Sequence, residues 1–132
     1  MVSVIHMKQP DGGWIVHDTR VVASTNIATT RRDRRRGMKA FPDASLPLVI
    51  DRCRWVHSFG MRFAVDIAYL DADNTIVAIR HLEPNRLALP VWRATRVVEA
   101  EPGAFARWGL GIGDTVSIRD TFIGDAETRP HT

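Results

Sequence analysis

The chain has 132 residues, of which 45% are hydrophobic and 25% charged, and its formal net charge is +3. These values are typical of one globular domain with its own hydrophobic core, and they exclude a fibrous or low-complexity protein. A single cysteine, Cys53, excludes an internal disulfide. The sequence has no apolar run near the ~18 residues that span a bilayer and no secretory signal pattern, so we expect a cytoplasmic protein.

Arginine supplies nearly all of the positive charge, since Lys8 and Lys39 are the only lysines. The densest run is RRDRRR, which contains Arg31, Arg32, Arg34, Arg35 and Arg36. Arginine pairs with phosphate through two parallel hydrogen bonds, so this run is a candidate surface for an anionic partner. A solvated helix face is the ordinary explanation of such a run, because a net charge of +3 gives a weak long-range field.

The first elements in chain order are two short strands and a helix. Gly12-Gly13 indicates a turn, and residues 14–17 and 20–23 have strand-like composition. Ser24, Thr25 and Asn26 are each suited to cap a helix start, and Gly37 is suited to end a helix. The sequence therefore predicts a helix from about residue 24 to Arg36.

The rest of the chain indicates more strands. We predict strands over residues 46–51, 63–70, 76–82, 95–100 and 115–118, and a short helix from Pro102-Gly103 to Trp108. In residues 63–70, alternation places Phe63, Val65, Ile67 and Tyr69 on one face and Asp66 on the other.

Together these elements predict a mainly β fold. The expected form is a small antiparallel barrel or sandwich, with one helix in the N-terminal half and one short helix in the C-terminal half. We expect residues 1–123 to form the single domain and residues 124–132 to form a flexible polar tail. At least two of the four tryptophans are expected in the core.

The run from Leu46 to Asp71 contains a characteristic set of residues, namely Cys53, His57, Phe59, Met61, Asp66 and the Tyr69-Leu70-Asp71 end. Val97-Val98-Glu99 before Pro102-Gly103, Gly109, Gly113-Asp114 and the Arg34–Met38 element complete the pattern. In these motifs residues 20–118 resemble the DUF192 family of uncharacterised bacterial and archaeal domains. The resemblance implies a compact, mainly β domain and very little about activity.

Asp66 is the centre of the predicted site because alanines flank it on its own strand face and leave room around the carboxylate. We predict a small ligand pocket formed by His57, Met61, Asp66, Glu99 and Cys53. The alternative for Asp66 is structural, as an acceptor of backbone N–H bonds that fixes a loop. For Glu99 the alternative is an exposed pair with an arginine.

Cys53, His57 and Met61 stand four residues apart and are soft ligands that suit Cu(I) or zinc. A spacing of four aligns side chains on a helix, whereas this segment has β-like neighbours, and an extended chain would hold the three too far apart for one ion. We therefore predict no metal and no cofactor.

The favoured function is a non-catalytic binding or accessory module that takes a small polar ligand in this pocket. One alternative is a hydrolase- or lyase-type enzyme that uses His57 as a base oriented by Asp66. The other alternative is an RNA-associated protein that binds through the arginine run. The sequence does not identify the ligand or the oligomeric state.

Overall fold

The computed structural model describes residues 11–28 and 46–120 of the chain. The described residues form strands β1 (Asp11–His17), β2 (Arg20–Ala28), β3 (Leu48–Asp51), β4 (Val65–Leu70), β5 (Ile76–Leu82), β6 (Arg96–Ala100) and β7 (Ser117–Asp120), with helix α3 (Ala104–Arg107) between β6 and β7. The mainly β class predicted from the sequence is confirmed. No helix in this part of the chain is long and apolar enough to cross a membrane.

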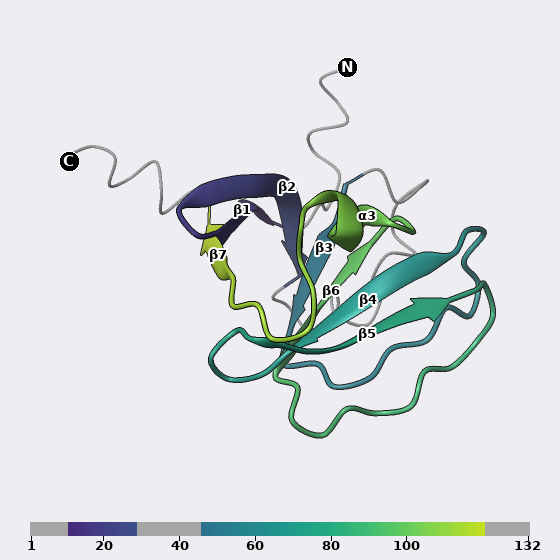
Figure 1. The fold of residues 1–132 in the computed structure, drawn as a ribbon. Helices are drawn as coiled ribbons and strands as arrows, with labels where there is room; N and C mark the ends of the chain where they lie inside the picture. Colours follow the sequence, from purple (N-terminus) through teal and green to yellow (C-terminus); the bar gives the residue numbers. More distant parts are fainter. Residues whose placement is uncertain (1–10, 29–45, 121–132) are drawn as a thin grey trace, which may run out of the picture.

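The strands form one strongly bent sheet in the order β5-β4-β6-β3-β2-β1-β7 (Figure 1). Neighbouring strands are antiparallel except β2 and β3, which are parallel. In the described part of the chain β5 and β7 do not pair, so the sheet is open rather than a closed barrel or two stacked sheets. The sheet ends approach at one isolated bridge between Thr75 and Thr115.

Both faces of the central strands are buried. Strand register shows which residues share a face, because residues directly opposite on antiparallel strands point to the same side. Ile67 opposes Glu99, and Ala68 opposes Val98. The face that carries Ile67 is the loop-covered face, whose core contains Leu48, Ile50, Val65, Ile67, Tyr69 and Val97. The face that carries Ala68 is the helix-covered face, whose core contains Val49, Ala68, Leu70, Val98, Ala100 and Phe105.

Two long connections cover the loop-covered face. They comprise residues 52–64 and 84–95, and we call them the loop pair. They run side by side from the sheet (Figure 1), held by backbone hydrogen bonds from Ala88 N to Val56 O and from Val91 N to Arg54 O. Val56, Met61, Ala88 and Ala94 fill the space beneath them. The loop pair is thus a folded layer that completes the core.

The other face is covered by α3 and the segment that follows it. Gly103 precedes α3 with φ of 85°, a left-handed conformation that favours glycine. Ala104 and Phe105 are buried against the sheet, and Leu110 and Val116 continue the same core. This short helix corresponds to the one predicted near residues 102–108.

The sequence prediction for residues 12–28 is wrong in two places. Gly12 and Gly13 lie within β1 rather than in a turn, and residues 24–28 belong to β2 rather than to a helix start. Thr25 is buried, and its hydroxyl donates to Pro47 O at 3.0 Å. The hydroxyl therefore joins β2 to the chain before β3 instead of capping a helix.

The arginine run and the predicted flexible tail lie outside the residues that the structure describes. Residues 29–36, the rest of the predicted helix, lie outside the described residues, as do residues 124–132. The anionic-partner surface at Arg31, Arg32, Arg34, Arg35 and Arg36 therefore stays a prediction.

Candidate functional site

The structure divides the predicted pocket between the two faces of the sheet. Glu99 pairs with Ile67 and is buried on the loop-covered face, at 3% exposed. Asp66 pairs with Ala100 and His81 and so belongs to the helix-covered face. These two carboxylates therefore do not converge on one ligand, and the division of acid and base roles between them is not formed.

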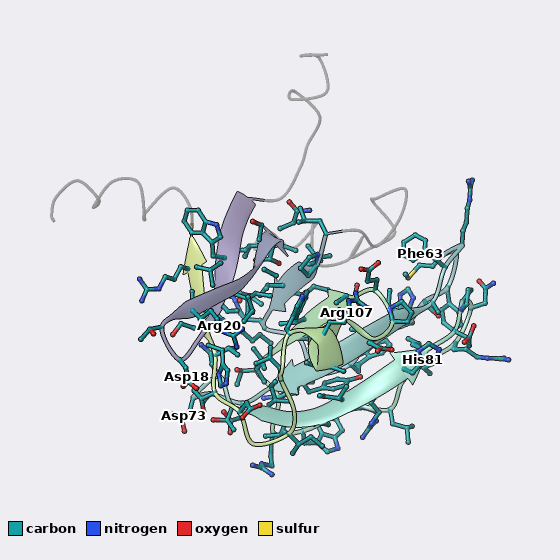
Figure 2. All side chains as sticks on the ribbon, turned by 45° about the horizontal axis from the view of Figure 1, so that its top comes forward. Asp18, Arg20, Phe63, Asp73, His81 and Arg107 are labelled. Atoms are coloured by element: carbon teal, nitrogen blue, oxygen red, sulfur yellow. The ribbon has the colours of Figure 1, made fainter. Side chains whose placement is uncertain are left out.

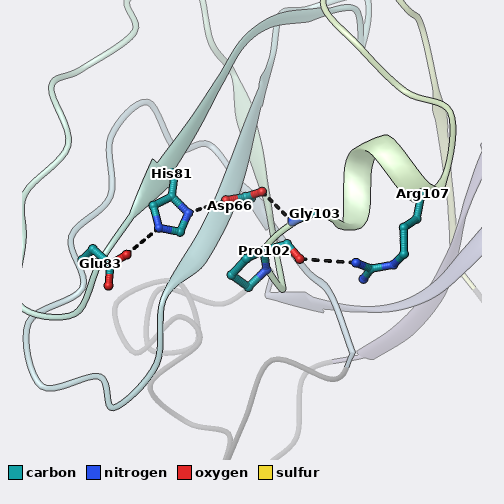
Figure 3. Close-up of polar contacts among 6 residues, drawn as sticks. All are labelled: Asp66, His81, Glu83, Pro102, Gly103 and Arg107. Atoms are coloured by element: carbon teal, nitrogen blue, oxygen red, sulfur yellow. Dashed lines mark hydrogen bonds and ion pairs between the residues drawn. The ribbon is translucent and has the colours of Figure 1, made fainter.

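Asp66 instead belongs to a chain of polar contacts on the helix-covered face (Figure 3). Its Oδ2 accepts a hydrogen bond from Gly103 N at 2.9 Å, and its Oδ1 lies 2.7 Å from His81 Nδ1. His81 Nε2 lies 2.7 Å from Glu83 Oε2. Asp66 thus joins the start of α3 to the edge strand β5, which is the structural role that the sequence left open for it.

The hydrogen bond to Glu83, and next the bond to Asp66, raise the pKa of His81 above its ordinary value of 6.5. Figure 2 shows this residue at the same end of the molecule as Phe63, away from Asp18 and Asp73. Because each ring nitrogen faces a carboxylate, the protonated ring donates two hydrogen bonds. Neither nitrogen is then available to take a proton from a substrate.

His57 lies on the loop pair and has other contact partners than Asp66, His81 and Glu83. It bridges to Leu87, its Nδ1 accepts a hydrogen bond from Phe59 N at 3.2 Å, and its ring stacks on Phe59 at 4.9 Å between centroids. Both oxygens of Asp66 contact other groups. The His57–Asp66 pair that the enzyme hypothesis requires is not formed in the structure.

Cys53, Met61 and Glu99 do share the loop-covered face, together with Tyr69. Tyr69 is fully buried, and burial raises its pKa to about 12, with a smaller opposing effect from Arg80. The Tyr69 hydroxyl has no hydrogen-bond partner among the described residues. Sequence reasoning treated Tyr69 as core only, although a tyrosine rather than a phenylalanine on a core face is a signal of a polar group inside.

The Cys53–Met61 segment is not helical, so its four-residue spacing does not align the soft ligands. Among the residues that the structure describes, no three or more His, Cys, Asp or Glu side chains gather as they would around a metal ion.

A groove of about 520 Å³ opens at the base of the loop pair, where the two connections leave the sheet. It is lined by Arg52, Cys53, Arg54, Trp55, Pro90, Trp92, Ala94 and Thr95. Of the predicted pocket residues, Cys53 is the one in this lining. The groove therefore combines aromatic rings with two guanidinium groups, and its lining has no carboxylate.

Contacts across the groove hold its walls. Cys53 N donates to Thr95 O at 3.1 Å, and Arg54 Nε donates to Ala94 O at 3.2 Å. Cys53 Sγ donates to Trp55 O at 3.2 Å, which ties the thiol to the wall. The first two bonds join residues about forty positions apart in sequence, so the fold sets how the two walls face each other.

The tryptophans are the main feature that the sequence analysis missed. Trp55 and Trp92 are 49% and 74% exposed, while Trp14 and Trp108 are partly buried. The expectation of at least two core tryptophans is wrong, since none of the four is buried. The signal was present in the sequence: Trp92 stands beside Arg93 in a connection between strands, and connections run mostly over the surface.

Comparison with protein families shows that the chain belongs to the DUF192 family, described as "Uncharacterized ACR, COG1430", whose model matches residues 14–118. No curated protein matches the chain. The matched region contains the whole described sheet except the first residues of β1 and the end of β7. The resemblance stated from the sequence is therefore confirmed.

Two solved structures are similar in fold. One is a protein of unknown function from Novosphingobium aromaticivorans, with 17% identity and a TM-score of 0.64, covering 80% of this chain and 83% of that chain. The other is a transcription regulator candidate from Sinorhizobium meliloti, with 16% identity and a TM-score of 0.66, covering 82% of this chain and 92% of that chain. At these identities the likeness concerns the fold alone.

Proposed function

We propose that the protein is a non-catalytic binding module that holds a small anionic ligand with an aromatic or apolar group in the groove at the base of the loop pair. The observation that carries the proposal is the lining, in which two exposed tryptophans stand beside two arginines without a carboxylate. Its volume of about 520 Å³ lies within the ~300–1,000 Å³ typical of small-molecule sites.

Each part of the lining favours one part of such a ligand. The faces of Trp55 and Trp92 offer stacking surface, and exposed rings of this size gain free energy when a ligand covers them. Arg52 and Arg54 supply donors for a carboxylate or phosphate. Asp51, the nearest acid along the chain, lies outside the lining and forms an ion pair with Arg96 at 2.9 Å.

The first test is a titration with 2-naphthoate, with 2-naphthamide as the uncharged control of the same shape. Two-dimensional NMR of the four tryptophan indole N–H groups reads out the site. We expect 2-naphthoate to shift the signals of Trp55 and Trp92, to leave those of Trp14 and Trp108 in place, and to bind more tightly than the amide. Equal binding of both compounds, or no shift at Trp55 and Trp92, would overturn the proposal.

Variants then separate the anion contact from the stacking contact. Arg52→Gln should weaken 2-naphthoate about tenfold, the range of a hydrogen bond to a charged group at a partly solvated site, and leave 2-naphthamide unchanged. Trp92→Ala should weaken both compounds. Arg119→Gln, on β7, and Asp66→Asn, on the other face of the sheet, are controls that should change neither.

A further inference from the structure

The outer surface of the loop pair has an unusual composition. Its exposed large hydrophobic side chains are Trp55, Phe59, Leu87, Leu89 and Trp92. Its exposed arginines are Arg52, Arg54, Arg62, Arg86 and Arg93. Residues 52–64 and 84–95 contain no aspartate or glutamate. The loop pair is therefore both apolar and purely cationic, whereas the rest of the described surface carries both signs of charge.

We propose that the loop pair docks onto an anionic lipid bilayer, with the leucine and tryptophan side chains entering the interface and the arginines contacting lipid headgroups. This goes beyond the groove because it uses the outer side chains of the loops, two of which, Leu87 and Leu89, do not line the groove. Tryptophan and leucine beside arginine is the composition that binds at the boundary between headgroups and acyl chains.

The backbone of the loop pair is suited to a surface with little water. Polar backbone groups that leave water need partners, and the two loops supply them to each other. Ser58 N donates to Arg86 O at 2.8 Å, Ala88 N to Val56 O at 3.0 Å, and Val91 N to Arg54 O at 2.9 Å. Entry into the interface therefore removes water mainly from side chains.

The exposed leucines favour lipid over single-stranded nucleic acid. Leu87 and Leu89 are 56% and 72% exposed, and aliphatic side chains gain from acyl chains but offer bases no ring to stack on. Two of the rings that could stack, His57 and Phe59, already lie on each other with an interplanar angle of 23°. One face of each is thus occupied.

The test uses the full chain and co-sedimentation with phosphatidylcholine vesicles, with and without phosphatidylglycerol. We expect binding to the anionic vesicles, weakened by salt, and a blue shift of tryptophan fluorescence on binding. Changing Arg62, Arg86 and Arg93 to glutamine should lower partitioning about a hundredfold, since each basic residue near an anionic surface contributes about fivefold. Arg20→Gln with Arg119→Gln, on β2 and β7, is compared with the double change Arg62→Gln with Arg86→Gln as a control that removes the same charge.

The apolar contribution is tested by Leu87→Ser with Leu89→Ser. This variant should lose vesicle binding and keep 2-naphthoate binding, whereas Ile112→Ser, at a 69% exposed position outside the loop pair, should keep both. Should the double change lower the melting temperature, Leu89→Ser alone gives the same comparison at the more exposed site. The naphthoate titration of each variant separates failure of this inference from failure of the groove.

Two results would overturn the inference. One is the absence of binding to anionic vesicles, or binding that the leucine changes leave intact. The other is binding of a single-stranded oligonucleotide that Trp55→Ala and Phe59→Ala abolish and the leucine changes do not, which would assign the surface to nucleic acid.

Discussion

At the scale of single residues, strand register determines the charged neighbours of His81, because it places Asp66 opposite the ring. Its cross-strand partner Asp66 and its neighbour Glu83 lie on either side of the ring, each 2.7 Å from one nitrogen. The ring is about half exposed, so solvent screens these contacts and their contribution to stability is modest. They nevertheless raise the pKa of His81, because both partners favour the cation.

The pKa of His81 is raised in the folded protein, so the folded state binds the proton more tightly than the unfolded state. Its contribution to stability is fully present below the unfolded value of about 6.5 and is lost as pH rises through the folded value. We expect His81→Gln to remove this fall in stability with rising pH. Urea unfolding of the two proteins across that range measures it.

The relative effects of Glu83 and Asp66 on the pKa of His81 can be measured directly. NMR titration of the imidazole should show the pKa falling most in Glu83→Gln and less in Asp66→Asn, since the bond to Glu83 is the larger cause. Glu101→Gln removes an exposed carboxylate that pairs with Arg107 and should leave the pKa in place. An unchanged value in Glu83→Gln would show that the His81–Glu83 contact does not form in solution.

Tyr69 provides a second prediction at this scale. The raised pKa, about 12 against the ordinary 10.0, means that the unfolded state releases the phenolic proton first. Stability should therefore fall as pH rises from 10 toward 12, and Tyr69→Phe should remove that fall and cost little at neutral pH. Tyr69 is the only tyrosine in the chain, so tyrosinate absorbance measures its pKa without interference. A pKa near 10 would mean that the hydroxyl reaches water.

At the scale of elements, the sequence predicts strands best where an apolar run lies between two turns. β5 is predicted without error, and β4, whose side chains also alternate, differs only at its first residues. β2 was predicted too short because Ser24, Thr25 and Asn26 suit both a helix cap and an edge of a strand. Pairing with β1 on one side and β3 on the other decides in favour of the strand, and that pairing is not visible locally.

Gly13 shows why β1 continues through a glycine pair. It lies between β2 and β7, and a Cβ at this position would stand 2.3 Å from Arg119 O and 2.7 Å from Ile27 Cδ1. The carbonyl belongs to the backbone of the paired strand and cannot move aside. The glycine therefore permits close approach of three strands and does not mark a turn.

We predict that Gly13→Ala destabilises the protein by about 1–3 kcal/mol, the usual cost of forcing extra atoms into a packed site. Chemical denaturation measures the difference. Gly111→Ala is the control, because a Cβ there meets nothing within 4 Å, and it should be close to neutral. Equal effects of the two changes would show that β1 and β7 do not pack as described.

At the scale of the whole molecule, the candidate site was only partly predictable. The alternation of β4 correctly separates Asp66 from Tyr69, yet the partners of Asp66 come from β5 and the turn before α3, and only the register reveals them. The groove is still harder to foresee, since its walls come from two connections that the sequence identifies merely as loops. Both features depend on contacts between residues far apart in sequence, and local sequence patterns do not reveal such contacts.

Ser58 is the residue that joins the loop pair at its outer half. It is fully buried; its hydroxyl donates to Glu83 O and accepts from Arg86 N at 2.9 Å, and its backbone carbonyl accepts from Asn85 N at 2.8 Å. A serine in this position replaces the hydrogen bonds that a regular strand pair would provide. The layer over the loop-covered face therefore depends on one hydroxyl as well as on apolar packing.

We predict that Ser58→Ala lowers the free energy of unfolding by about 1–3 kcal/mol, because buried backbone groups on the second loop lose their partner. Hydrogen exchange at the Arg86 amide should become faster, while the Val91 N to Arg54 O bond and the groove beside it persist. Ser24→Ala, at an exposed position on β2, is the control and should change neither quantity. A neutral Ser58→Ala would mean that the backbone hydrogen bonds between the loops and the packing of Val56, Met61 and Ala88 hold the loop pair without this hydroxyl.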